Sequence, residues 1–568
     1  MSQAGMETEF KSFKQAQEEL ERSVEKHLLN QQKQQKWSRA SEGEGVVAID
    51  VIMSDYMQPL VPVRVGGQRM LLLLDTTSSD SSVFLLGSPA CPRRDEPALC
   101  YAFQVSDSLG ICLNSAQQQG ESEAAHKSFA PSCASTTCAN ITYNPRASEK
   151  LLDDSVKPAQ RLFFLHRSLG PCNGVFIQEW YAEAVETVAV ELSRSRNPVL
   201  HMEGTPIRLM RSFDVIPAGM RLSSAGKQQA LYDTCGGLLG AGLPSSCRSS
   251  SLWAQIVEHL QAAVVSFDFD GGSHDGSNPR LVFSRQPMKS SIFPSLTWSE
   301  PTTSLDSSSA AAGQAFLMYH VSVCGINLLQ AVSSNWLAVL VTPSPCLILP
   351  PFLFDRLMSR IPAHCPFKIG EPAHGQLCRP GAPRGPVDTL PALSFRLSES
   401  DAEDKLLPLG RLVVKDDGAE EQLCISRFDR IDHTIDPLQS PYAADMTHSF
   451  IGLGSLAMAA MEIAVDLRSH RVGVATRHPI RSTNEYCTAS ITCPSPMQTY
   501  LAASNTCLDP SCSKYMLMTL DDSTKTCVWA HGVSFLFVLA LVVLACLDIF
   551  AHRLYRSAMQ AARCPRPY

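Results

Sequence analysis

Leu71-Leu72-Leu73-Leu74-Asp75-Thr76-Thr77-Ser78-Ser79 is the stretch that decides the fold. The leucines predict a buried strand, and Asp75 ends that strand at a turn rich in hydroxyl groups. Taken alone, an aspartate at the end of a strand most often caps a turn with its side-chain oxygen. The meaning of Asp75 therefore depends on whether matching elements occur elsewhere in the chain.

The two halves of the chain repeat one pair of elements. Asp75-Thr76-Thr77-Ser78 is followed by Cys235-Gly236-Gly237-Leu238-Leu239-Gly240, an apolar stretch that ends in glycine. In the second half, Val341-Thr342-Pro343-Ser344 is followed by Ser449-Phe450-Ile451-Gly452-Leu453-Gly454. This repetition predicts two related lobes.

Between these elements the chain consists of short apolar runs separated by turn residues. Many runs are rich in Val, Ile and Leu and have the length of a strand. The 37 Pro and 32 Gly residues supply the many turns that such an architecture needs. The sequence therefore predicts an all-β fold.

These elements resemble those of the pepsin-like aspartic proteases, from about Val46 to Arg477. LVPVRVGGQRMLLLLDTTSSDSSVF is similar to the first hairpin and active-site turn of that family, and WLAVLVTPSPCLILPPFLFDRLM is similar to the second. The resemblance implies a bilobal all-β fold of two related barrel-like lobes. It also implies that an extended peptide or protein binds in the cleft between the lobes, and that no cofactor is needed.

The resemblance makes Asp75 the catalytic acid of the first motif, and it assigns further residues to the two active-site turns. The second motif has Val341 where the family has its other aspartate. The reaction needs two carboxylates that share one proton, and valine neither accepts nor donates a proton. The residues expected to complete the turns are Thr76, Thr77, Ser78, Thr342 and Ser344.

We therefore expect a catalytically impaired homologue that acts as a peptide-binding or interaction module. Thr77 and Pro343 also stand where the family has glycines, which allow the two turns to approach closely. The alternative is an active aspartic endopeptidase that cleaves extended polypeptides in the secretory pathway or at the cell surface.

Tyr181 is the candidate for the tyrosine of the flap that covers the substrate in the family. The family's glycine and serine do not follow it here. A strand tyrosine without such a role is the alternative.

The 20 cysteines occur in clusters and predict disulfides, which form in a secretory or extracellular compartment. Zinc is the competing interpretation, but no C-x₂-C pair occurs, and we expect no metal site. Asn140 begins an Asn-Ile-Thr glycosylation sequon in a Cys-rich insertion. The net charge of −7 gives no reason to expect a nucleic-acid partner.

The stretch from Gly532 to Ala551 is apolar enough to predict a membrane-spanning helix, and the short tail that follows it contains several arginines. We therefore expect a single-pass membrane protein with a lumenal or extracellular body and a short cytosolic C-terminal tail. Residues 1–45 contain no apolar stretch long enough for a signal peptide. Targeting is then expected from an upstream start or from the C-terminal span.

The expected organisation has six parts. They are a charged N-terminal helical segment (1–45), an N-terminal lobe (46–262) with a Cys-rich insertion at about 91–157, a C-terminal lobe (263–480), a Cys-rich juxtamembrane stalk (481–528), a transmembrane helix (529–551) and a basic cytosolic tail (552–568).

Overall fold

The structure is a computed structural model, and its description covers most of the two predicted lobes and part of the C-terminal region. The charged segment 1–45 and much of the Cys-rich insertion lie outside the described residues. The described residues are 46–54, 57–86, 88, 91, 100–102, 106, 108–113, 137–140, 156–164, 174–193, 199–216, 235–242, 251–270, 278–285, 296–301, 314–329, 332–361, 363–364, 379–380, 390–401, 403–415, 421–427, 450–477, 499–501, 506–508, 518–520, 527–529 and 531–562.

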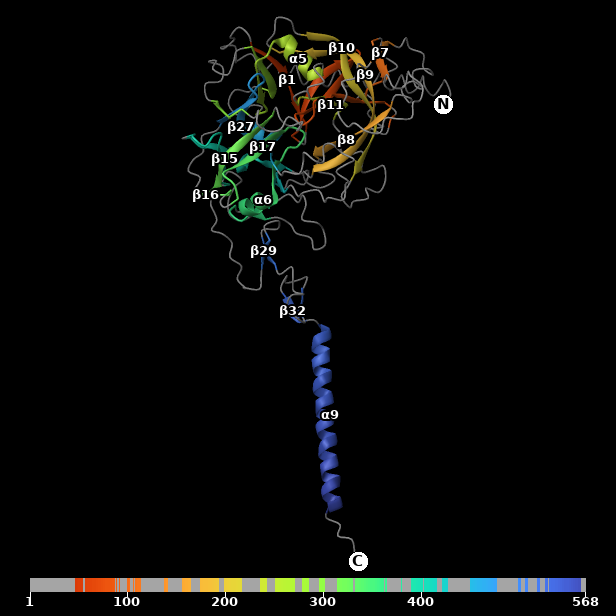
Figure 1. Ribbon diagram of the computed structural model, residues 1–568, viewed down its shortest axis with the longest axis vertical. Helices are drawn as coiled ribbons and strands as arrows, with labels where there is room; N and C mark the ends of the chain where they lie inside the picture. Colours follow the sequence, from red (N-terminus) through yellow and green to blue (C-terminus); the bar gives the residue numbers. More distant parts are fainter. Residues whose placement is uncertain are drawn as a thin grey trace, which may run out of the picture. The chain divides into compact units, whose positions relative to one another are not determined.

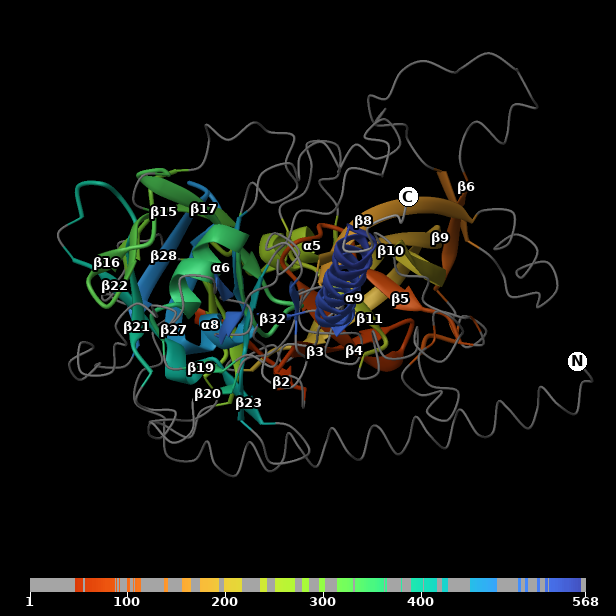
Figure 2. The ribbon, with the colours of Figure 1, turned by 90° about the horizontal axis from the view of Figure 1, so that it is seen from below.

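The chain divides into two compact units, Met1–Ala489 and Ser490–Tyr568. The first unit contains three large sheets (Figure 1). In Figure 2 the strands of the first half of the chain, such as β9 and β10, lie on one side of this unit, and those of the second half, such as β15 and β17, lie on the other. The predicted bilobal all-β architecture is confirmed.

The N-terminal lobe is built on a 10-stranded sheet. Its strand β4 is buried over its whole length, as the leucine run predicts for a strand covered on both faces. The strands are β2 (Ile52–Met53), β3 (Pro59–Val65), β4 (Gln68–Asp75), β5 (Ser82–Phe84), β6 (Gly110–Leu113), β7 (Thr137–Asn140), β8 (Lys157–Phe164), β9 (Gly174–Glu191), β10 (Val199–Ile216) and β11 (Gly237–Gly240).

The C-terminal lobe is built on an 8-stranded sheet. Its strands are β15 (Ala315–Val323), β16 (Ile326–Asn327), β17 (Asn335–Val341), β18 (Leu347–Leu349), β21 (Ala392–Arg396), β22 (Lys405–Pro408), β25 (Ile425–Arg427) and β26 (Ile451–Gly454). Two short hairpins accompany it, β19 (Ala363–His364) with β20 (Arg379–Pro380), and β23 (Val413–Lys415) with β24 (Glu421–Leu423).

A third, 6-stranded sheet takes strands from both halves of the chain, so that it joins them. Strand β12 pairs with β27 across this junction, with Val264 opposite Asp466. Its strands are β1 (Val46–Asp50), β12 (Val264–Asp268), β13 (Arg280–Ser284), β14 (Thr297–Trp298), β27 (Met461–Asp466) and β28 (Arg471–Thr476). The described residues of the unit also form the helices α5 (Leu252–Leu260), α6 (Pro351–Met358) and α8 (Ser455–Ala460) and the 3₁₀ turn η7 (Leu409–Arg411).

The two lobes share one local topology. In the N-terminal lobe β4 runs parallel to β11, β11 antiparallel to β5, and β5 parallel to β10. In the C-terminal lobe β17, β26, β18 and β25 pair in the same order and with the same directions. The repeat predicted from the sequence therefore corresponds to four strands that pair in the same order and directions in each lobe.

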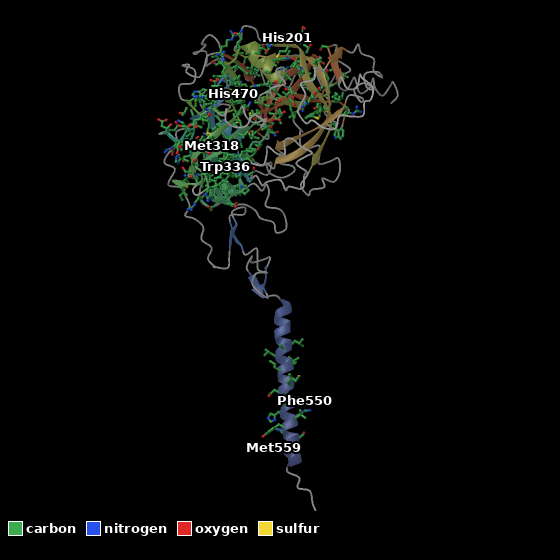
Figure 3. The ribbon with its side chains drawn as sticks, in the orientation of Figure 1. His201, Met318, Trp336, His470, Phe550 and Met559 are labelled. Carbon is green, nitrogen blue, oxygen red and sulfur yellow. A yellow bond between two sulfur atoms is a disulfide. The ribbon has the colours of Figure 1, made fainter. Side chains whose placement is uncertain are left out.

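The second unit contains the hairpins β29 (Thr499–Leu501) with β30 (Thr506–Leu508) and β31 (Met518–Leu520) with β32 (Cys527–Trp529). It also contains the 32-residue helix α9 (His531–Ala562), on which Figure 3 labels Phe550 and Met559.

The prediction of a transmembrane helix at 529–551 is contradicted. Among the described residues, no helix combines the length and the apolar character that crossing a bilayer requires. The predicted single-pass localisation, with its lumenal body and cytosolic tail, depended on this span and is corrected with it.

Candidate active site

Two threonines join the lobes at the centre of the first unit. The backbone N–H of Thr76 donates to the hydroxyl of Thr342 at 3.0 Å, and the N–H of Thr342 donates to the hydroxyl of Thr76 at 3.1 Å. Each hydroxyl also donates across the junction at 2.6 Å, from Thr76 to the carbonyl of Leu340 and from Thr342 to that of Leu74. Both side chains are buried, so the two turns are held together by a nearly symmetric set of hydrogen bonds.

Asp75 ends β4 and is buried, with 1% of its surface exposed. Its Oδ1 atom accepts hydrogen bonds from the backbone N–H of Thr77 at 2.9 Å and from the hydroxyl of Thr77 at 2.6 Å. The first of these bonds closes a turn of the type that aspartate forms with the residue two positions ahead. The carboxyl group of Asp75 is therefore held by its own turn.

Val341 occupies the position in the C-terminal lobe that Asp75 occupies in the other. Asp75 lies opposite Gly240 in the β4–β11 pair, and Val341 lies opposite Gly454 in the β17–β26 pair. Val341 is fully buried and ends β17. The structure thus places an apolar side chain at the second of two equivalent positions.

The glycines opposite these two positions allow the turns to fold back closely. A Cβ atom at Gly240 would lie against the backbone of Asp80, and one at Gly454 would lie against the backbone of Ser344 and Cys346. Only a residue without a side chain fits at such a distance. The apolar-apolar-glycine elements found in the sequence therefore support the turns.

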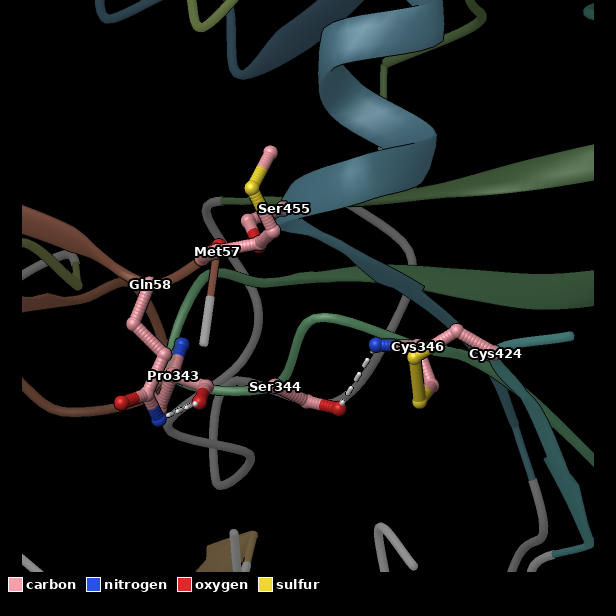
Figure 4. Close-up of a disulfide and its surroundings, with 7 residues drawn as sticks. All are labelled: Met57, Gln58, Pro343, Ser344, Cys346, Cys424 and Ser455. Carbon is pink, nitrogen blue, oxygen red and sulfur yellow. Dashed lines mark hydrogen bonds between the residues drawn. A yellow bond between two sulfur atoms is a disulfide. The ribbon is translucent and has the colours of Figure 1, made fainter. Parts of the chain in front are cut away.

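The second turn is held from several sides (Figure 4). The N–H of Ser344 donates to the carbonyl of Val341 at 3.2 Å, and the Ser344 hydroxyl accepts from the N–H of Cys346 at 3.3 Å. Cys346 is disulfide-bonded to Cys424, which directly precedes β25. In the first turn, the Ser78 hydroxyl accepts from the N–H of Asp80 at 3.2 Å. Thr76, Thr77 and Ser78 thus lie in the first turn and Thr342 and Ser344 in the second, and Thr76 and Thr342 join the two turns.

The first turn has an ion pair where the second has its disulfide. Asp80 lies five residues after Asp75, as Cys346 lies five after Val341. The Nη2 atom of Arg208, in β10, is 2.6 Å from Oδ2 of Asp80. Strands β10 and β25 have equivalent places in the two lobes, so the first turn is cross-linked to β10 and the second to the residue that directly precedes β25. Sequence reasoning missed Arg208, because it lies 128 residues from Asp80 with no local motif around it.

Tyr181 lies within β9, with 4% of its surface exposed, in a core cluster with Phe84 and Met210. The guanidinium of Arg208 stacks over its ring, 4.2 Å from the ring centre. The structure therefore places Tyr181 in the core of the N-terminal lobe, and its role as a cover for the cleft stays a prediction.

A second buried carboxylate was also missed by sequence reasoning. Glu186 is fully buried, and it accepts hydrogen bonds from the hydroxyls of Tyr101, Ser106 and Ser108 and from the N–H of Thr187. Burial raises the pKa of Tyr101 above its usual value, and the charge of Glu186 raises it further. This cluster joins Tyr101, Ser106 and Ser108 to β9.

The predicted disulfides are confirmed for Cys91–Cys100 and Cys346–Cys424. Asn140 is the last residue of β7, and its glycosylation stays a prediction.

Comparisons with known proteins give only a distant structural likeness. The crystal structure of basic 7S globulin from soybean is similar with a TM-score of 0.44 and 11% sequence identity, over 78% of this chain and 96% of that chain. No protein-family model matches the chain, and no curated protein matches it.

Proposed function

We propose that the protein is a catalytically impaired homologue of the pepsin-like aspartic endopeptidases and acts as a peptide-binding or interaction module. One observation carries this proposal. Val341 stands in the register position equivalent to that of Asp75, so the two equivalent positions hold one carboxylate where the reaction needs two.

The chemistry explains why one carboxylate is insufficient. In the paired arrangement one acid is ionised and takes a proton from water, while the other is protonated and donates a hydrogen bond to the scissile carbonyl. Val341 can do neither. General acid–base assistance contributes about 10²–10⁴-fold per group, so its loss, together with the loss of water positioning, leaves little useful rate.

The preserved junction supports a binding role. The Thr76–Thr342 hydrogen bonds and both glycine supports are intact although the second acid is absent. We propose that an extended peptide or protein segment lies between the two lobes and is held without being cleaved. An active endopeptidase is the second candidate, and the buried Asp75 at an intact first turn favours it.

Restoring the second acid tests this proposal. The double variant Val341→Asp with Pro343→Gly is expected to gain peptidase activity by about 10²-fold or more at acidic pH, because it supplies the second carboxylate and the missing turn glycine. Val341→Asn with Pro343→Gly is the matched control, since asparagine has a similar size but does not titrate. A double variant that is folded but no more active than the wild-type chain would contradict the inference that the missing second acid is what impairs the site.

A further inference from the structure

Two buried glutamines occupy equivalent places in the two lobes. Gln58 directly precedes β3, and Gln314 directly precedes β15. Strands β3 and β15 each pair antiparallel with the strand that carries a central turn, β4 in one lobe and β17 in the other. The exposed fractions of Gln58 and Gln314 are 4% and 2%.

Each glutamine donates its side-chain amide to the opposite lobe. The Nε2 atom of Gln58 donates to the carbonyl of Pro343 in the second turn at 2.6 Å, as Figure 4 shows. The Nε2 atom of Gln314 donates to the carbonyl of Ala241, which follows β11 in the N-terminal lobe. The two contacts therefore cross the junction in opposite directions.

We propose that Gln58 and Gln314 are positioning residues that act as reciprocal interlobe latches and hold the two central turns in register beside the Thr76–Thr342 pair. A latch is here one buried amide-to-carbonyl hydrogen bond between the lobes. Breaking a latch would leave a buried amide donor and a buried carbonyl acceptor without a hydrogen bond, which costs free energy. The role of the latches does not depend on whether the site is catalytic.

The base of the Gln58 latch is itself fixed. The N–H of Gln58 donates to the Ser54 hydroxyl at 3.1 Å, and the Gln58 carbonyl accepts from the N–H of Ser54 at 2.9 Å. Between them Met57 has a left-handed backbone with φ of 58°, a conformation that non-glycine residues seldom adopt. The hydroxyl of Ser455, from the other lobe, donates to the Met57 carbonyl. The backbone of Gln58 is thus held by contacts other than the bond of its side chain to Pro343.

The two latches differ in one respect. Among the described residues, the Oε1 atom of Gln314 is buried without a hydrogen-bond partner. An unpaired buried acceptor opposes the stabilisation that the amide bond provides. We therefore expect the Gln58 latch to be the stronger of the two.

Hydrogen exchange of the full chain tests the latches. Gln58→Leu is expected to speed exchange of the N–H groups of Thr76, Thr342 and Ser344 by at least about fivefold, because a buried hydrogen bond across the junction is lost. Gln314→Leu is expected to have a smaller effect at the same groups. Gln68→Leu is the matched control, since Gln68 is equally buried but bonds Ala102 within its own lobe at 2.8 and 2.9 Å.

A second variant keeps the test decisive where leucine prevents folding. Gln58→Glu has no donor when it is ionised, but its protonated carboxyl can again donate to the Pro343 carbonyl. Protection of Thr342 is therefore expected to be lost near neutral pH and regained at acidic pH, relative to the wild-type chain. Unchanged protection of Thr342 in both Gln58 variants, or an equal loss in Gln68→Leu, would overturn the proposal.

Discussion

Thr76 and Thr342 donate their backbone N–H groups to each other's hydroxyl, at 3.0 and 3.1 Å, although they are 266 residues apart. The same hydroxyls donate to Leu340 and Leu74 in the opposite strands. The junction of the lobes is therefore a closed set of hydrogen bonds. It is complete although the position equivalent to Asp75 is occupied by the apolar Val341. The hydrogen bonds that hold the two turns together therefore do not depend on a second carboxylate.

Thr342→Val is expected to destabilise the protein by roughly 2–5 kcal/mol, because it leaves the buried Thr76 N–H and Leu74 carbonyl without their partner. Valine has nearly the shape of threonine, so packing changes little. The measurement is the free energy of unfolding in denaturant. Thr342→Ser, which keeps the hydroxyl, is the control, and equal stability of the two variants would contradict the interpretation.

Gly454→Ala is expected to destabilise the C-terminal lobe by about 1–3 kcal/mol or more, because its Cβ would meet the backbone of Ser344 and Cys346. Gly325→Ala is the comparison. Gly325 has φ of 72°, but a Cβ added there would meet open space, so only backbone strain should appear, at about 1–2 kcal/mol. Thermal unfolding measures both. Protection of Ser344 from exchange should fall only in Gly454→Ala.

Arg208→Met is expected to cost about 1–3 kcal/mol, since it removes the ion pair with Asp80 and the stacking on Tyr181 from a site that is mostly buried. Arg396→Met is the matched control. The Arg396–Asp404 pair is equally short, at 2.6 Å, but is more exposed, so its loss should cost less than about 1 kcal/mol. Equal costs in denaturant unfolding would show that Arg208 does not support the first turn.

Tyr101 is expected to resist ionisation at alkaline pH. Because the pKa of Tyr101 is higher in the folded than in the unfolded chain, the unfolded chain loses this proton first as the pH rises. Stability should therefore be unaffected by this group below the usual pKa of tyrosine, about 10, and should fall as the pH rises above it. Tyr101→Phe should flatten the fall. An unchanged slope of unfolding free energy against pH would contradict the assignment.

The sequence predicts the frame of the site well because that frame is encoded locally. The leucine run, the Asp75 turn and the apolar-glycine elements each have a pattern that a short window contains, and their repetition aligns Val341 with Asp75. In the structure Asp75 lies opposite Gly240 and Val341 lies opposite Gly454, in equivalent parallel strand pairs.

The contacts that hold the site could not be predicted in the same way. Gln58 and Pro343 are 285 residues apart, and nothing in either neighbourhood indicates that they bond. Arg208 and Glu186 are likewise recognised only once β9 and β10 are placed. The interpretation of 532–551 rested on one apolar window of about the length of a span, and no helix among the described residues meets the requirement for crossing a bilayer.

The most direct test compares the wild-type chain with Asp75→Asn on a mixture of extended peptides at acidic pH, with cleavage products detected by mass spectrometry. If one carboxylate cannot sustain the reaction, the two proteins should produce indistinguishable products while both bind peptide. Cleavage by the wild-type chain that disappears in a folded Asp75→Asn variant would contradict the account and identify an active endopeptidase.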